Sequence, residues 1–183
     1  MKTLLLGDSI LRFIPPDILG TVDNKSSVGR YTWMVERDVP TYNIEMYDKI
    51  FLLIGINDFL NRGYTAQKTS DCIISVVNTI QSLKPQDLTV LGLLPVLEDT
   101  FEESEYCNVN IPLINSNVKK YCDENSIQFL DCYSLFLDKQ GRIDKTFLRD
   151  GLHPSDKGYN ILTRVINKEI KQTEKLKENE LSK

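Results

Sequence analysis

The stretch that decides the fold is TLLLGDS at residues 3–9, a short apolar run that ends in glycine and leads directly into an aspartate and a serine. A continuous apolar run of this length is typical of a β-strand buried on both faces. Residues 10–14 leave room for about one helical turn before Pro15-Pro16 stops it. Ser9 is therefore predicted at a strand-to-helix bend, where backbone N–H groups point outward and can meet an anion.

The same pattern returns at residues 49–58, KIFLLIGIND, where a second apolar run ends in glycine and a polar pair follows. Further strands are predicted at residues 88–94 and 127–130, with a short one near Val22. Helices are predicted at residues 31–37, with Trp33 and Met34 turned inward, and at 65–83, around 114–122 and from Ser155, which can N-cap the last helix. This alternation favours an α/β fold, a three-layer sandwich around a parallel sheet of about five strands.

The length and composition suit one domain over residues 1–183: the chain is 41% hydrophobic and 26% charged. Residues 171–183 are a charged tail that we expect to fray. The net charge of −4 and the lack of a long basic run argue against nucleic-acid binding. No stretch is long enough to span a bilayer.

Four scattered cysteines, Cys72, Cys107, Cys122 and Cys132, form no Cys-x-x-Cys pair, and a single histidine exists to join them, which argues against a zinc site. Scattered thiols suit a reducing compartment, although a disulfide pair stays open. The apolar run at residues 3–6 is too short for a signal-peptide core. The expected location is cytoplasmic.

The only histidine lies in the stretch RDGLHP, residues 149–154, three positions after Asp150. Taken alone, Asp-x-x-His could be an ordinary turn before a helix. A carboxylate on one ring nitrogen would nevertheless leave the other free to take a proton from a nucleophile. Acyl transfer needs a nucleophile, a base, an orienting carboxylate and donors for an oxyanion. Ser9, His153 and Asp150 supply the first three, and the N–H groups of Ser9 and Gly29 with the Asn57 amide supply the donors.

Four blocks of the sequence resemble, in order and rough spacing, the conserved blocks of the SGNH (GDSL-type) hydrolases. They are GDSIL from Gly7, Gly29, GIND from Gly55 and DGLHP from Asp150. The resemblance spans residues 3 to about 170. It implies a flavodoxin-like α/β/α sandwich, esterase or acylhydrolase activity, and no metal or cofactor. The second block departs from the family pattern, which often has an asparagine before its glycine, whereas this chain has NKSSVG at residues 24–29. Asp8 and Asp58 belong to the motifs and are expected to hold loops in place.

The residues near the four motifs give indications of the substrate class. Arg12, Arg30, Arg62 and Arg149 lie near them, and either bind an anionic substrate group or balance the acidic stretch at residues 98–105. That stretch is expected to be a solvated loop or to flank the site, and Asp131 either caps a turn or takes part in catalysis. No apolar insertion is large enough for a lipase lid, which favours a short acyl group.

The leading hypothesis is therefore an esterase that removes acetyl groups from a small-molecule or carbohydrate ester. The alternatives are an O-acetyltransferase, a thioesterase or a lysophospholipase-type acylhydrolase on the same three residues, or a carbohydrate-binding module that has kept the fold. The chain could also form a homo-oligomer.

Overall fold

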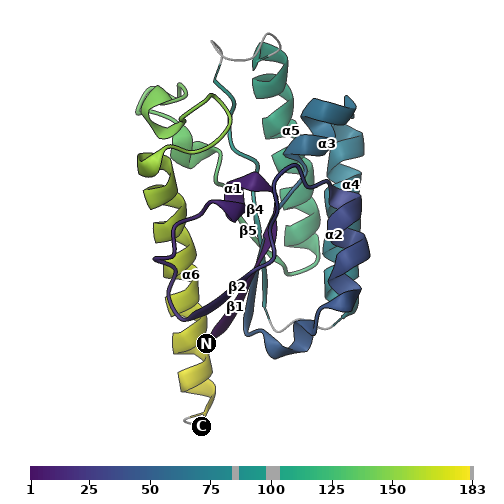
Figure 1. Ribbon diagram of the computed structural model, residues 1–183, viewed down its shortest axis with the longest axis vertical. Helices are drawn as coiled ribbons and strands as arrows, with labels where there is room; N and C mark the ends of the chain where they lie inside the picture. The colour runs from purple at the N-terminus through teal and green to yellow at the C-terminus, as the bar shows by residue number, and fades with distance from the viewer. Residues whose placement is uncertain (84–86, 98–103, 182–183) are drawn as a thin grey trace.

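The computed structural model describes residues 1–83, 87–97 and 104–181, and contains a five-stranded parallel sheet in the order β2-β1-β3-β4-β5 (Figure 1). The strands are β1 (Lys2–Gly7), β2 (Thr21–Asn24), β3 (Lys49–Leu53), β4 (Leu88–Leu91) and β5 (Gln128–Leu130). The helices are α1 (Ser9–Arg12), α2 (Thr32–Asp38), α3 (Ile56–Arg62), α4 (Ala66–Ser82), α5 (Ser104–Glu124) and α6 (Asp156–Leu181). Short 3₁₀ turns cover Val39–Thr41, Ile44–Met46, Ser134–Phe136 and Lys145–Phe147.

The sheet is the middle of three layers, as the sequence predicted. Helix α6 covers one face, and α2, α4 and α5 form the layer on the other (Figure 1). All residues of β1 from Thr3 onward and all of β3 are buried, which is why their sequences are continuous apolar runs and do not alternate. The strand predicted at residues 88–94 is shorter and ends at Leu91.

The strand order places a switch point between β1 and β3, because the chain leaves β1 toward β2 on one side and leaves β3 toward β4 on the other. Ligands of open parallel sheets bind at such points, beyond the carboxyl ends of the strands. Ser9 follows β1 and Asn57 follows β3, so these two side chains flank the switch point.

Two expectations about packing are wrong. Trp33 is not a core residue: its side chain is 43% exposed, and the Arg37 guanidinium lies 5.3 Å from its ring centroid. The buried residues of α2 are Thr32 and Val35, and Val39 follows them inside, so the inward face is set by a spacing of three to four residues that leaves position 33 outside.

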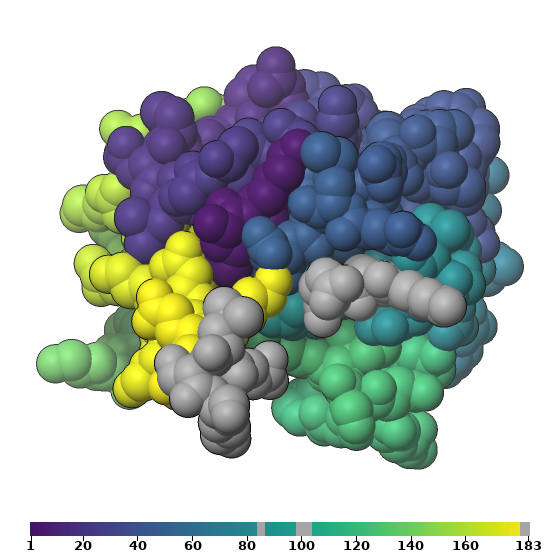
Figure 2. Space-filling model, turned by 90° about the horizontal axis from the view of Figure 1, so that it is seen from below, coloured from purple at the N-terminus to yellow at the C-terminus, as the bar shows by residue number. Residues whose placement is uncertain are grey.

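The C-terminal residues also differ from the expectation, since α6 continues through residues 171–181 where the sequence predicted a frayed tail. Ile170 and Thr173 are buried, and the Lys177 ammonium pairs with Asp48 at 2.5 Å. Figure 2 shows this yellow end of α6 against the purple N-terminal segment. The high content of Lys and Glu led to the prediction of a frayed tail, but these residues form a helix that is stabilised by one buried face and by an ion pair. The acidic residues 98–103 lie outside the described residues, while Ser104 and Glu105 open α5.

Candidate active site

Ser9 is the first residue of α1 and is held at the end of β1 by its neighbours. The Asp8 carboxylate caps the helix by accepting a hydrogen bond from the Ile10 N–H at 3.0 Å. Gly7 leaves no room for a side chain, because a Cβ there would lie 2.3 Å from the Leu53 carbonyl oxygen of β3. Ser9 itself is only 6% exposed, so its hydroxyl sits in a fixed, largely desolvated position.

His153 and Asp150 lie on a tight loop that closes on itself just before α6. Leu148 and Pro154 form an isolated antiparallel bridge, and the Arg149 N–H donates to the His153 carbonyl at 2.8 Å. Gly151 adopts φ +86°, a backbone conformation that favours glycine, and its carbonyl accepts from the Leu97 N–H at 2.8 Å. Ser155 then N-caps α6 by accepting from the Gly158 N–H at 3.3 Å, as the sequence predicted.

This loop places His153 next to Ser9, although the two residues are 144 positions apart in the sequence. Ser9 Oγ lies 2.8 Å from His153 Nε2, and His153 Nδ1 lies 2.9 Å from Asp150 Oδ2. Asp150 Oδ1 also accepts from the N–H groups of His153 at 2.8 Å and Leu152 at 3.2 Å. Partial burial acts to raise the pKa of Asp150, but these hydrogen bonds outweigh it and lower the pKa to about 2. An ionised carboxylate at Nδ1 favours the tautomer that carries its proton there, so Nε2 is left to accept the proton of Ser9.

Gly29 lies in the segment that follows β2. Beyond β2 the chain still follows β1, because Lys25 N–H donates to Leu5 O at 2.9 Å and Ser27 N–H to Gly7 O at 3.2 Å. Gly29 follows two residues later, in a turn just beyond this contact with Gly7 at the end of β1. Gly29 has φ +67°, and no atom lies within 4 Å of where its Cβ would be, so a substrate can approach its backbone.

The Asn57 amide is oriented by hydrogen bonds at both ends. Its Nδ2 donates to the Arg30 carbonyl at 3.1 Å, and its Oδ1 accepts from Asn61 Nδ2 at 3.0 Å. This leaves the second N–H of the amide for another acceptor. No helix was predicted at residues 56–62 from the sequence, and Asn61, which lies about one helical turn after Asn57 in α3, was therefore missed.

Both motif aspartates are buried, and each holds a helix start. Asp58 accepts from the Thr32 N–H at 2.9 Å and the Thr32 hydroxyl at 2.8 Å, which ties α3 to the first turn of α2. Asp8 caps α1, but its Oδ2 is buried without a hydrogen-bond partner among the described residues. Burial, helped by the nearby Asp58 carboxylate, raises the pKa of Asp8 to about 7 against the opposing Ile10 N–H. Asp131 was predicted either to cap a turn or to take part in catalysis. Its carboxylate accepts a hydrogen bond from the Ser134 N–H at 3.2 Å, which fits the capping role.

The four arginines near the motifs do not share one environment. Arg30 is only 3% exposed, and its guanidinium is bound to Asp38 at 2.8 Å, Tyr42 at 3.2 Å and the Lys25 carbonyl, so the prediction that it binds substrate is wrong. Arg62 is exposed between the rings of Tyr31 and Tyr64. Arg12 is the exposed last residue of α1, and Arg149 lies 3.6 Å from Asp150 Oδ2.

Two further observations describe the residues that the structure covers. Within them, no three His, Cys, Asp or Glu side chains gather into a group that could hold a metal ion, and no disulfide joins any of the four cysteines. None of the helices in the described ranges combines the length and the apolar character needed to cross a bilayer.

Comparison with solved structures finds the same fold in several bacterial proteins at low sequence identity. A candidate acylhydrolase from Bacteroides fragilis NCTC 9343 superposes with a TM-score of 0.79 at 20% identity, over 94% of this chain and 87% of that one. A GDSL-like lipase from Bacteroides thetaiotaomicron gives 0.78 at 18% identity, over 93% and 88%. A catalytic mutant of an acetylxylan esterase from Geobacillus stearothermophilus gives 0.72 at 18% identity, over 92% and 93%.

Comparison of the sequence itself gives the family. No curated protein matches the chain. The model of the GDSL-like lipase/acylhydrolase family matches residues 17–161, a range that contains Asn57, Asp150 and His153. Since this match covers most of the 183 residues, the chain belongs to the GDSL-like lipase/acylhydrolase family of enzymes.

Proposed function

We propose that the protein is a serine esterase that removes short acyl groups, with acetyl groups on a carbohydrate as the leading substrate class. The observation that carries the proposal is the continuous chain of contacts from Ser9 Oγ to His153 Nε2 at 2.8 Å and from His153 Nδ1 to Asp150 Oδ2 at 2.9 Å. This is the arrangement that activates a serine hydroxyl, with each member in hydrogen-bond reach of the next.

In the first half of the reaction, Ser9 Oγ attacks the acyl carbonyl carbon while its proton passes to His153 Nε2. The carbonyl oxygen becomes an oxyanion that accepts hydrogen bonds from the Ser9 and Gly29 N–H groups and from the free N–H of Asn57. Asp150 stabilises the imidazolium without taking its proton. The bond to the leaving alcohol oxygen then breaks, His153 returns the proton to that oxygen, and the acyl group stays on Ser9.

In the second half, a water molecule replaces the alcohol. It gives a proton to His153 Nε2 and attacks the acyl carbon, and the tetrahedral intermediate collapses to release a carboxylic acid while the proton returns to Ser9 Oγ. A sugar hydroxyl in place of the water would give an acetyltransferase. The acetyl preference is supported by the fold shared with the acetylxylan esterase and by the lack of a long apolar insertion in the sequence.

The test compares p-nitrophenyl acetate with the octanoate, and measures acetate released from O-acetylated xylooligosaccharides. Wild type is expected to turn over the acetate faster and to react with a fluorophosphonate probe. Ser9→Ala should lose both properties, while Ser116→Ala, an exposed serine on α5, should keep them. Faster turnover of the octanoate would refute the short-chain specificity, and absence of probe labelling on Ser9 would refute the mechanism.

A further inference from the structure

A groove of about 790 Å³ lies along α6, away from Ser9 and His153. One wall is the helix, and the loop that follows α1 contributes Asp17 to the other. The helix lines the groove with four cations, Arg164, Lys168, Lys171 and Lys175. The groove is thus strongly cationic in a chain whose net charge is −4.

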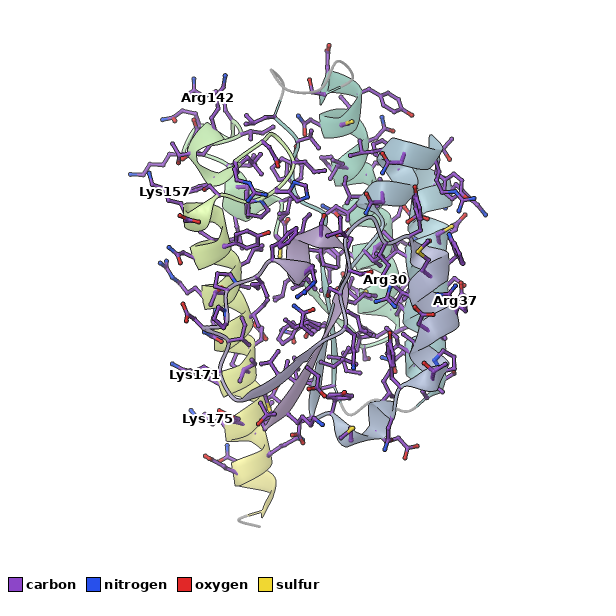
Figure 3. All side chains as sticks on the ribbon, in the orientation of Figure 1. Arg30, Arg37, Arg142, Lys157, Lys171 and Lys175 are labelled. Carbon is purple, nitrogen blue, oxygen red and sulfur yellow. The ribbon has the colours of Figure 1, made fainter. Side chains whose placement is uncertain are left out.

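The cations belong to a basic stripe, which we define as Lys157, Arg164, Lys168, Lys171 and Lys175. The intervals between them are three, four or seven residues, which keeps them on one side of a helix over about 27 Å. All five are exposed, and Figure 3 shows Lys157, Lys171 and Lys175 projecting from the side of α6 turned away from the sheet. Across the described ranges of the chain, no carboxylate forms an ion pair with any of the five. Asp156, Glu174 and Glu178 also lie on α6. Among the residues that line the groove, however, four cations face one carboxylate, Asp17, so the lining has a net charge of +3.

The groove is lined by Asp17 and by α6 from Asn160 to Lys175, and the two segments that carry these residues both start near the proposed catalytic residues. The loop at residues 13–19 leaves α1, which starts with Ser9, and α6 starts three residues after His153. The Phe13 ring lies edge-on to the His153 ring, with 6.5 Å between centroids. Farther down, Asn167 fastens the loop to the helix by accepting from the Leu19 N–H at 2.8 Å and donating to the Asp17 carbonyl at 2.9 Å. The end of the groove at Asn160 therefore lies at the end of α6 that follows His153.

We infer that the groove binds an anionic carbohydrate chain and that the natural ester is carried on such a chain, an inference that rests on the proposed esterase function. Lysine and arginine would pair with uronate or sulfate groups, and the exposed amides of Asn160 and Gln172 would bond to sugar hydroxyls. A membrane surface fits less well, because the apolar face of α6 is buried against the core and Leu176 is the one large apolar side chain that is exposed among the described residues of the helix. Nucleic acid fits less well, because the groove offers no aromatic side chain for base stacking.

The experiment measures binding and catalysis separately. Binding of an unacetylated polygalacturonate oligosaccharide is measured by calorimetry with Ser9→Ala, alone and combined with Lys171→Gln/Lys175→Gln. The matched control combines Ser9→Ala with Lys119→Gln/Lys120→Gln on α5. We expect the double substitution on α6 to weaken binding about tenfold, because it removes two ion pairs with the ligand, and the control substitutions on α5 to leave the affinity unchanged. Binding should also weaken steeply as salt is raised from 50 to 300 mM.

In the catalytic arm, the enzyme with Ser9 intact hydrolyses O-acetylated polygalacturonate and O-acetylated xylan. Lys171→Gln/Lys175→Gln should raise KM about tenfold for the anionic polymer, with kcat, the neutral polymer and p-nitrophenyl acetate unaffected. Equal KM values for both lysine pairs would overturn the inference while leaving the esterase intact. So would tighter binding to phosphatidylglycerol vesicles or to duplex DNA than to polygalacturonate. Loss of all ester hydrolysis in wild type would instead refute the proposed function.

Discussion

At the scale of single residues, His153 has no substitute, because the sequence contains no second histidine. His153→Ala removes the acceptor for the Ser9 proton and should lower kcat/KM for p-nitrophenyl acetate by about 10³-fold or more. The ring is only partly buried, so the thermal midpoint should stay close to that of wild type. Stopped-assay kinetics and a thermal melt check both parts, and substantial activity in the folded variant would refute the assigned role.

Asp8 makes a prediction about stability and pH. Its pKa is raised to about 7 in the folded protein from an ordinary value of 3.8, so between these values the folded state holds a proton that the unfolded state has lost. The free energy of unfolding therefore falls as pH rises through this window, and the loss is complete above pH 7. A shift of about three units corresponds to roughly 4 kcal/mol at most.

Asp8→Asn cannot ionise and should escape that loss while keeping an oxygen for the Ile10 N–H. The variant pays a constant cost at all pH values for an amide N–H placed where Oδ2 has no partner among the described residues. The difference in unfolding free energy, variant minus wild type, should thus rise by up to about 4 kcal/mol from pH 4 to pH 8. Urea titrations at several pH values measure it, and two parallel curves would show that Asp8 is not protonated in the folded state.

At the scale of elements, the position of the His153 loop depends on the first turn of α6. A Cβ on Gly158 would lie 2.2 Å from the Phe147 carbonyl oxygen and 3.0 Å from Pro154 Cβ. Gly158→Ala, which would stabilise an isolated helix, should here push the loop away and cost about 1–3 kcal/mol. Because Pro154 adjoins His153, kcat should fall more than KM rises. Asn179→Ala, an exposed position near the other end of α6, is the control. A Gly158→Ala enzyme with unchanged kcat and stability would contradict the packing.

The elements themselves were largely predictable from the sequence, and the exceptions have physical causes. The apolar runs at residues 3–6 and 49–54 predicted β1 and β3 because strands buried on both faces leave no other pattern. Trp33 was misplaced because a seven-residue helix is too short for its inward face to be read from spacing alone. The end of α6 was misread because Lys177 is stabilised by Asp48, which lies 129 residues away.

The same limit applies to the site. Motif order predicted that Ser9, Asn57, Asp150 and His153 would lie together, because parallel strands end at one edge of the sheet. Motif order could not separate Arg30 from the other three arginines, since its burial depends on Asp38 and Tyr42 packing around it. Nor could it show the groove, which needs the loop after α1 to lie against α6.

At the scale of the whole molecule, a buried polar network ties the layers together at the end of the sheet opposite Ser9. Lys49, which opens β3, is only 1% exposed, and its ammonium contacts Asp87 at 2.7 Å and Gln128 of β5 at 3.3 Å. Thr173 of α6 donates to the same Asp87 carboxylate at 2.9 Å, and Gln128 donates to Glu169 of α6 at 2.5 Å. One lysine thus links two strands and the long helix.

Lys49→Met keeps the length and apolar body of the side chain but removes the charge. The Asp87 carboxylate then loses its cation and keeps the Thr173 hydroxyl as a donor, while Gln128 Oε1 keeps the Thr89 hydroxyl. Because Asp87 is partly exposed, the loss should be about 2–4 kcal/mol, somewhat below that of a fully buried pair. Lys119→Met, which removes an exposed pair with Asp123 on α5, should cost under about 0.5 kcal/mol. Urea denaturation of both variants, with Asp87→Asn to complete a double-mutant cycle, measures the coupling. Lys49 opens β3, whereas Asn57 follows the other end of the strand, so kcat should stay within about twofold of wild type. A large fall in kcat without loss of stability would mean that the network supports the site and not the assembly of the layers.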